Sequence, residues 1–378
     1  MGDAMASVSG GYNAGMAERE KTTRRDFILG QSVVDELGGM LPAESGASVL
    51  DQQASHDERP AYLVQISRRA MACEWSVFLN AGQHIGAEET AIRALDLVDE
   101  LEDQLSVFRD DSEICGLNRL ASTKSVEVGR RLFGLLSRSV EASELTDGAF
   151  DITAGPISKL WGFLKRDGRF PNDRELSETL NRVGSRWLAL DIENHAVAFL
   201  RDGLEINLGA IGKGHALDQC VSLMHSEGVD DFLIHGGQSS VVARGSRGGG
   251  DRGWTVGVKH PLRPDLRLAE IFLRDQALGT SGSAAQSFRH QGKRYGHILD
   301  PRTGYPADGV LSATVIAPDA TVADALSTAF YVLGVERSFE ICESRPDWAA
   351  IFVLEGRRSG AVEIQSFGLA DDVWRQQV

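Results

Sequence analysis

Cysteine is scarce in this 378-residue sequence, and long apolar runs are missing from it. The four cysteines, Cys73, Cys115, Cys220 and Cys342, have no CxxC spacing, so they predict neither a zinc site nor a dense disulfide framework. None of the nine histidines belongs to an HExxH motif. No apolar run approaches the roughly 20 residues that an integral membrane helix needs. The function must therefore be sought in other kinds of site.

Positive charge is also in short supply. The chain has 39 Lys and Arg against 54 Asp and Glu, which gives a net charge of −15. Such a protein repels nucleic-acid phosphates and anionic membrane surfaces, so we expect non-specific binding to neither. Hydrophobic residues make up 42% and charged residues 25%, as in soluble globular proteins with a core. A phosphate ligand would need a local cation, a helix terminus or a metal ion.

The N-terminal part, residues 1–58, is rich in Gly, Ala, Ser and Glu and has weak periodicity, which predicts a flexible tail. Within it, Arg24 and Arg25 resemble the start of a twin-arginine export signal. The apolar segment that such a signal requires is interrupted by Asp35 and Glu36. An exported protein, a cytoplasmic protein and a short charged amphipathic helix at this place all fit the pattern.

Residues 59–378 mix predicted strands and helices without a regular βαβ alternation, which favours an α+β fold over a doubly wound sheet. The apolar spacing predicts long helices over residues 86–108 and 321–333. We expect a loop after Ser112 and a turn at Thr280–Gly282.

The stretch from Leu204 to Asp218 reads LEINLGAIGKGHALD. Its first part alternates apolar and polar residues, which predicts a strand, and its last part begins a helix. The glycines around Lys213 would let the backbone approach an anion at the helix N-terminus. This is not a Walker A loop, because Asn207 and Gly214 stand where that motif has its first Gly and its Ser or Thr. A phosphate site and a helix start with a solvent-facing lysine both fit.

A second group of polar residues, Asp324, Ser327 and Thr328, lies at helical spacings i, i+3 and i+4 and therefore on one face. One carboxylate and two hydroxyls suit a hard cation such as Mg²⁺. A purely structural interpretation is also open, since Asp is favoured near a helix start and Ser and Thr bond back to helix carbonyls. A cation held by Asp324 would help an acidic protein to bind a diphosphate.

Several short motifs occur in order across nearly the whole chain after residue 60. They are Met71, Ser106–Phe108, Gly148–Asp151, Asn207–Gly214 with Asp218, Gly236–Gly237, Thr280–Gly282, His297–Gly304 and Ala323–Thr328. No single motif is specific, but together they resemble the motifs of the ApbE-type FAD:protein FMN transferase family.

The resemblance implies a single α+β domain over residues 59–378, with mixed, mainly antiparallel sheets flanked by helices. It also implies Mg²⁺-dependent transfer of FMN from FAD to a threonine hydroxyl of a target flavoprotein, with release of AMP. By residue match, it implies flavin-nucleotide binding by Met71, Phe108, Ala149, Phe150, Asp151, Asn207, Lys213 and Ile298. It implies Mg²⁺ binding by the main-chain oxygen of Ala210 and the side chains of Asp324, Ser327 and Thr328.

Catalysis of this transfer should rest on positioning and on stabilisation of pyrophosphate charge by Mg²⁺ and Lys213. A base must accept the threonine proton, and Asp324 and His297 are the candidates. A buried histidine that fixes its own loop is an equally good interpretation of His297. For Phe108 and Phe150, a position in the hydrophobic core is a commoner role of phenylalanine than contact with a nucleotide.

Some positions depart from the usual pattern of the family. Asn207, Gln238 and Ser283 stand where an aspartate is frequent, and His215 replaces an aromatic residue. These departures leave substrate preference and metal affinity open. An FAD pyrophosphatase, in which water replaces the threonine, and a non-catalytic FAD-binding protein are the alternatives. The intact Lys213 and the intact aspartate of the 323–328 motif favour an active enzyme.

Overall fold

The computed structural model describes residues 62–282, 286–358, 360–370 and 373–376. The chain divides into two units, Met1–Ser55 and His56–Val378, and all described residues belong to the second. The predicted tail with its arginine pair lies outside the described residues, and so does Ser283.

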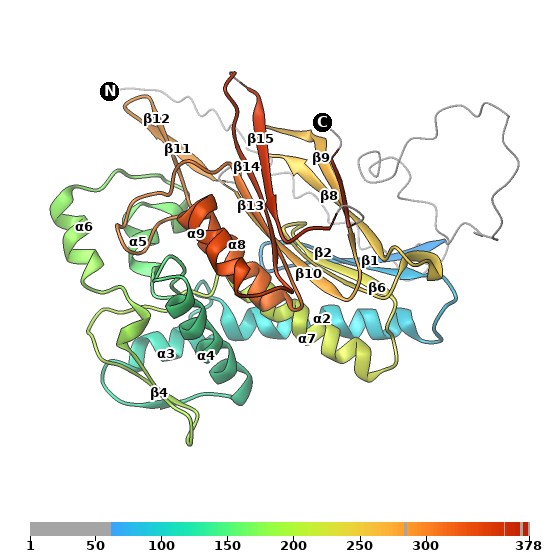
Figure 1. The fold of residues 1–378 in the computed structure, drawn as a ribbon. Coiled ribbons are helices and arrows are strands. Elements are labelled where there is room, and N and C mark those ends of the chain that lie inside the picture. The colour runs from blue at the N-terminus through green and yellow to red at the C-terminus, as the bar shows by residue number, and fades with distance from the viewer. Residues whose placement is uncertain (1–61, 283–285, 359, 371–372, 377–378) are drawn as a thin grey trace, which may run out of the picture. The chain divides into compact units, whose positions relative to one another are not determined.

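An eight-stranded sheet forms the centre of the described fold (Figure 1). Every neighbouring pair of its strands is antiparallel, which confirms the predicted α+β class with mainly antiparallel sheets. In spatial order the strands are β1 (Leu63–Ala70), β2 (Cys73–Asn80), β6 (Phe232–Gly236), β7 (Ser240–Arg244), β10 (Gln276–Gly282), β13 (Ser312–Ala317), β14 (Ala349–Glu355) and β15 (Val362–Phe367).

Helices pack against one face of this sheet (Figure 1). They are α2 (Ala87–Leu105), α7 (Gly212–Ser226), α8 (Ala320–Leu333) and α9 (Val335–Glu343). Because successive side chains of a strand point to opposite faces, Ile234, Val242 and Val315 join the core under the helices. The helices predicted over 86–108 and 321–333 are confirmed within a few residues, as α2 and α8.

The opposite face of the sheet packs against a three-stranded sheet made of β8 (Trp254–His260), β9 (Arg263–Leu273) and β16 (Trp374–Gln376). Leu233 and Leu278 of the large sheet share a buried cluster with Trp254, Ile271 and Leu273 of the small one. The fold thus has three layers, with helices, large sheet and small sheet in that order.

The remaining elements complete the described part of the fold. The helices are α3 (Glu113–Leu120), α4 (Arg130–Leu145), α5 (Gly155–Leu160) and α6 (Asp173–Leu180), with short 3₁₀ turns at Phe163–Lys165, Ser185–Trp187 and Arg247–Gly249. The strands are β3 (Val126–Glu127), β4 (Leu188–Asp191), β5 (Ala196–Phe199), β11 (Ser287–His290) and β12 (Lys293–Gly296). No helix in the described ranges is long and apolar enough to cross a membrane, and the four cysteines are free.

The loop predicted after Ser112 is wrong, because these residues form α3. Ser112 has an extended conformation, and its side chain accepts a hydrogen bond from the Cys115 N–H. This is the geometry of a helix N-cap, so the serine starts a helix where the prediction placed a loop.

The strand predicted over Leu204–Leu208 is also wrong. Its apolar residues are buried as the alternation indicates, but the segment pairs with no strand in the described part of the chain. Instead, the Asn118 side chain donates to the Ile206 carbonyl at 2.9 Å and accepts from its N–H at 2.8 Å. An amide side chain thus takes the place of a neighbouring strand.

The turn predicted at Thr280–Gly282 is a third correction, because these residues form the end of β10. They pair with Ser312–Thr314 of β13, and the Thr280 and Thr314 hydroxyls lie 2.9 Å apart. Sheet pairing therefore overrides the local turn preference of the Thr-Ser-Gly sequence.

Candidate active site

Lys213 and Asp324 meet where α7 begins. The Lys213 Nζ lies 3.2 Å from Oδ1 and 3.4 Å from Oδ2 of Asp324. The Gly214 N–H donates to Oδ2 at 3.0 Å, and the Ser240 hydroxyl donates to Oδ1 at 2.9 Å. Only 6% of the Asp324 side chain is exposed. The structure therefore brings two of the predicted catalytic residues together around one buried carboxylate.

Gly214 allows this approach. A Cβ atom at this position would lie 2.1 Å from the Ala320 carbonyl oxygen and 2.8 Å from the Asp324 Cβ. Gly279 of β10 plays a similar part on the other side, because its Cβ would lie 2.3 Å from the Ala323 carbonyl oxygen. The third glycine of the loop thus serves the close packing of α7 on α8, which the loop sequence alone did not indicate.

Asp218 adds another contact between the two helices. Its carboxylate accepts hydrogen bonds from the N–H groups of Ala320 at 2.8 Å and Thr321 at 2.9 Å, and from the Thr321 hydroxyl. Sequence reasoning gave Asp218 no role, because its partners are more than a hundred residues away. We call this contact region the seam; it comprises Lys213, Gly214 and Asp218 on α7 and Ala320, Thr321 and Asp324 on α8.

Hydroxyl groups gather next to the seam. The Ser327 hydroxyl is fully buried and donates to the Asp324 carbonyl at 2.9 Å, as the structural interpretation of this residue expects. Ser281 of β10 lies 2.9 Å from the Ser327 hydroxyl and 3.0 Å from that of Thr328. Sequence reasoning missed Ser281 and Ser240. The Thr280–Gly282 motif contains the signal for Ser281, but its local sequence predicts a turn.

The donors around Asp324 fit a magnesium ion by their chemistry. They comprise one carboxylate and the hydroxyls of Ser327 and Thr328, and Ala210 lies in the turn that leads into α7. These are hard oxygen ligands, which Mg²⁺ prefers, and Mg²⁺ commonly completes its shell with water and substrate phosphate. In the described residues, no cluster of three or more His, Cys, Asp and Glu side chains could hold a metal ion. A cation here would therefore depend on hydroxyl, main-chain and substrate oxygens.

Met71 occupies the two-residue turn between β1 and β2. It and Ala72 have φ angles of 48° and 60°, a left-handed conformation that costs energy in residues with side chains. The Met71 N–H donates to a carboxylate oxygen of Glu102 at 2.8 Å. In Cys73, which follows this turn, burial raises the thiol pKa, and the Lys213 charge opposes this effect. The strained turn thus lies near the seam.

The two predicted phenylalanines have opposite surroundings. Phe150 is 2% exposed and belongs to the core, as does the neighbouring Ala149, whereas Phe108 is 73% exposed. Asp151 ties its loop to other segments, because its carboxylate accepts from the N–H and hydroxyl groups of both Thr153 and Ser185 at 2.6–2.8 Å. The Asp151 oxygens are thus engaged within the protein. Of the two phenylalanines, only Phe108 has its ring at the surface.

Two of the departures from the family pattern stabilise turns. The Asn207 side-chain oxygen accepts from the Gly209 N–H at 2.9 Å, which an aspartate would also do. Gln238 has a φ of 60° in the turn between β6 and β7, and its side-chain oxygen accepts from the Lys259 ammonium at 2.6 Å. Both substitutions are therefore compatible with the local fold.

The contacts of His297 involve other residues than those of the seam. Its Nδ1 and its main-chain N–H are each 3.2 Å from the Gln286 carbonyl oxygen. Because a carbonyl only accepts, Nδ1 carries the proton and Nε2 is the basic atom. Burial lowers the pKa of His297, and Ile298 beside it is 8% exposed. Within the described residues, the His297 ring hydrogen-bonds to neither Lys213 nor Asp324.

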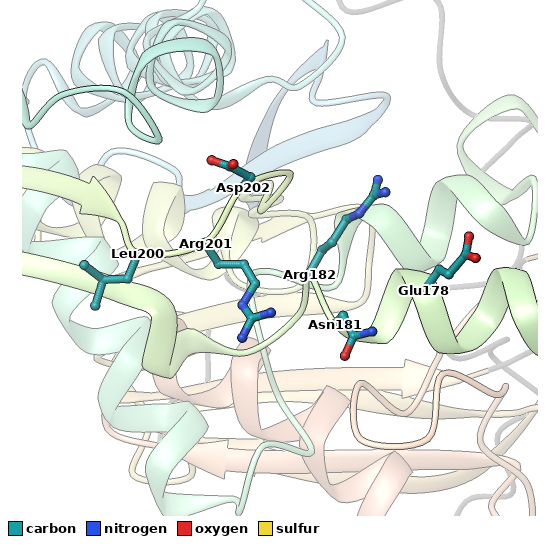
Figure 2. Close-up of a pocket in the computed structure, with 6 residues that line it drawn as sticks. All are labelled: Glu178, Asn181, Arg182, Leu200, Arg201 and Asp202. Atoms are coloured by element: carbon teal, nitrogen blue, oxygen red, sulfur yellow. The ribbon is translucent and has the colours of Figure 1, made fainter.

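An open hollow of about 410 Å³ lies elsewhere, between the end of α6 and the loop after β5 (Figure 2). Its lining residues are Glu178, Asn181, Arg182, Leu200, Arg201 and Asp202. Two cations and two carboxylates share this surface, and it includes none of the predicted site residues. The hollow is therefore not the candidate active site.

Comparison with known proteins places the chain in a family. The model of the ApbE family matches residues 71–352. The FAD:protein FMN transferases of Klebsiella pneumoniae and Treponema pallidum are 33% and 34% identical to this chain. The first alignment covers 71% of this chain and 84% of that protein, and the second covers 73% and 79%.

Solved structures agree with the sequence comparisons. The ApbE protein of Thermotoga maritima is 32% identical with a TM-score of 0.72, and the alignment covers 80% of this chain and 96% of that one. The apo form of the Pseudomonas stutzeri flavinyl transferase ApbE is 26% identical with a TM-score of 0.72, over 83% and 100%. Residues 71–352, which the family model matches, include the whole seam and the His297 motif. The chain therefore belongs to the ApbE family.

Proposed function

We propose that this protein is an FAD:protein FMN transferase that moves FMN from FAD to a threonine hydroxyl of an acceptor protein. The names of its relatives support this activity. The observation that carries it is the buried Asp324 carboxylate, held by Lys213 and the Gly214 N–H at the start of α7. A lysine in the first turn of a helix suits a pyrophosphate, because its charge adds to the positive end of the helix dipole.

In the proposed reaction, the threonine oxygen attacks the phosphorus atom on the FMN side of the pyrophosphate. A new phosphorus–oxygen bond forms, the bond to the bridging oxygen breaks, and AMP leaves with that oxygen. Lys213 would bind and orient the phosphates. Asp324, Ser327, Thr328 and the Ala210 carbonyl would hold Mg²⁺, which when bound offsets the charge of the pyrophosphate.

The threonine must lose its proton as it attacks. The Nε2 atom of His297 is free to accept it, since the Gln286 carbonyl holds the proton on Nδ1. Asp324 is the other candidate base, but its oxygens already accept from Lys213, Gly214 and Ser240. We therefore favour His297 as the base.

The direct test is to incubate the protein with FAD, Mg²⁺ and an acceptor flavoprotein domain, followed by mass spectrometry. We expect the acceptor to gain one FMN while AMP is released. Asp324→Asn should lower turnover about 100-fold or more, since it removes a charge from the reacting site. Asp202→Asn, in the hollow of Figure 2, is the control and should keep full activity.

Other results would change the proposal. AMP and free FMN without a modified acceptor would indicate an FAD pyrophosphatase. Bound but uncleaved FAD would indicate a flavin-binding protein. Undiminished transfer by the wild-type protein in excess chelator would rule out a requirement for Mg²⁺.

A further inference from the structure

We propose that Asp218 is a positioning residue for this reaction, which holds the Asp324 carboxylate at its place against Lys213. The inference rests on the proposed function for the reaction itself, but its geometric part can be tested without turnover. The sequence places Asp218 in the glycine-loop motif of the family, but the motif by itself does not indicate a contact with α8.

The contacts of Asp218 join one helix to the beginning of another. Its side chain projects from α7 and accepts hydrogen bonds from the N–H groups of Ala320 and Thr321, at 2.8 and 2.9 Å. These are the first two residues of α8, whose N–H groups have no partner within their own helix. A carboxylate at a helix N-terminus is also stabilised by the helix dipole.

A second attachment lies one turn further along α8. Ala320 and Asp324 are four residues apart and share a helix face. Asp324 binds Lys213 and the Gly214 N–H, while the Ala320 carbonyl packs directly against Gly214. Two attachments along one face restrict both sliding and rotation of α8 relative to α7. Loss of the Asp218 contact would let Asp324 shift away from Lys213.

A simple capping role does not account for Asp218. Asp319 already caps α8, because its side chain accepts from the Val322 N–H at 2.9 Å. Asp218 therefore supplies a second carboxylate to this terminus from a different helix. Burial raises the pKa of Asp218, so its charge is kept there at a cost. Arg138 of α4 lies 3.9 Å from Asp218 and 2.6 Å from Asp319, and so tethers a third helix to the same point.

The test compares two carboxylates at one helix end. Asp218→Asn keeps the side-chain shape but turns an NH₂ group towards the N–H donors of α8. Asp319→Ala removes the cap within α8 and leaves the contact with α7 intact. Both variants should lower the melting temperature by a few degrees and remain folded at 20 °C or below. Cation affinity is measured as Mn²⁺ binding by electron paramagnetic resonance, and crystal structures give the Lys213–Asp324 distance.

We expect Asp218→Asn alone to weaken Mn²⁺ binding and to raise the Mg²⁺ concentration for half-maximal turnover, each about tenfold. The KM for FAD should not change, and excess Mg²⁺ should restore most of kcat, which a loss of folded protein would not permit. The Lys213 Nζ–Asp324 Oδ1 distance, 3.2 Å here, should lengthen in this variant only.

Two results are decisive against the inference. An unchanged distance in Asp218→Asn, or equal Mn²⁺ affinities in the two variants, would overturn it. A wild-type protein without transferase turnover would instead refute the proposed function, and the crystallographic distance would still decide whether Asp218 positions Asp324.

Discussion

In the seam, Lys213, Gly214 and Asp218 contact α8 directly. In the described part of the chain, the His297 ring instead hydrogen-bonds to the carbonyl of Gln286 and packs against Phe163. The seam is built from main-chain groups and short side chains at hydrogen-bonding distance. The His297 region is built on aromatic rings, with centroids 5.3 Å apart for Trp161–Phe170, 5.6 Å for Trp161–Tyr295 and 5.7 Å for Phe288–Tyr295.

The two regions should therefore tolerate change differently. Backbone atoms in van der Waals contact cannot yield without moving a helix, so the seam is rigid. Ring packing is less directional, and it permits small adjustments of the 297–304 loop. This difference suits the proposed function, in which one part of the site would hold a charged pyrophosphate and another would accommodate an acceptor protein.

The largest effect is expected at the closest backbone contact of the seam. Gly214→Ala would place a methyl group 2.1 Å from the Ala320 carbonyl oxygen. We expect it to lower the free energy of unfolding by about 3 kcal/mol or more, because overpacking here forces the helices apart. Urea denaturation measures this loss.

Gly134→Ala is the matched control for this substitution. Gly134 lies within α4, is exposed, and has no atom within 4 Å of its would-be Cβ. Alanine there should stabilise the protein by up to about 1 kcal/mol, since glycine is a poor helix former. Equal effects of the two substitutions would mean that the seam is not tightly packed.

How much of this organisation the sequence reveals depends on how local each signal is. The α8 helix follows its own apolar period, so its limits are predicted almost to the residue. The 204–208 segment misleads because its alternation reports burial, while its partner is the distant Asn118. The role of Asp218 is invisible for the same reason, since its partners come from another part of the chain. Family motifs name Lys213 and the aspartate of α8, but they do not give the contact between them.

A smaller effect, confined to the chemistry, is expected in the His297 region. His297→Asn keeps an N–H donor for the Gln286 carbonyl but has no basic nitrogen. If His297 is the base, kcat should fall about 100-fold while the KM for FAD is unchanged. The wild-type rate should rise with pH below about 6.5, because burial lowers the pKa of His297 and the neutral ring is the active form. This rise should be absent from the variant.

His290→Asn provides the comparison within the same region. The His290 ring stacks on Phe170 at 4.5 Å between centroids and has no proposed chemical role. The His290→Asn substitution should leave kcat unchanged. If His297→Asn is equally harmless, the proton goes to Asp324 and the seam performs the chemistry alone.

The smallest effect concerns a residue of α7 that lies beside the seam without belonging to it. His215 is 6% exposed, and its Nε2 has no hydrogen-bond partner among the described residues. The charges of Arg131 and Arg138 on α4 reach it. Burial lowers the pKa of His215 to about 4, so the unfolded chain, with a pKa near 6.5, binds the proton more readily. Stability should therefore fall as the pH drops from 7 towards 4.

His215→Phe should remove about 1 to 2 kcal/mol of this loss between pH 7 and pH 5, as measured by urea denaturation at each pH. Parallel curves of stability against pH for the two proteins would contradict the role of His215 in this loss. An altered Mn²⁺ affinity in the variant would mean that the contact of His215 with α4 also affects the seam.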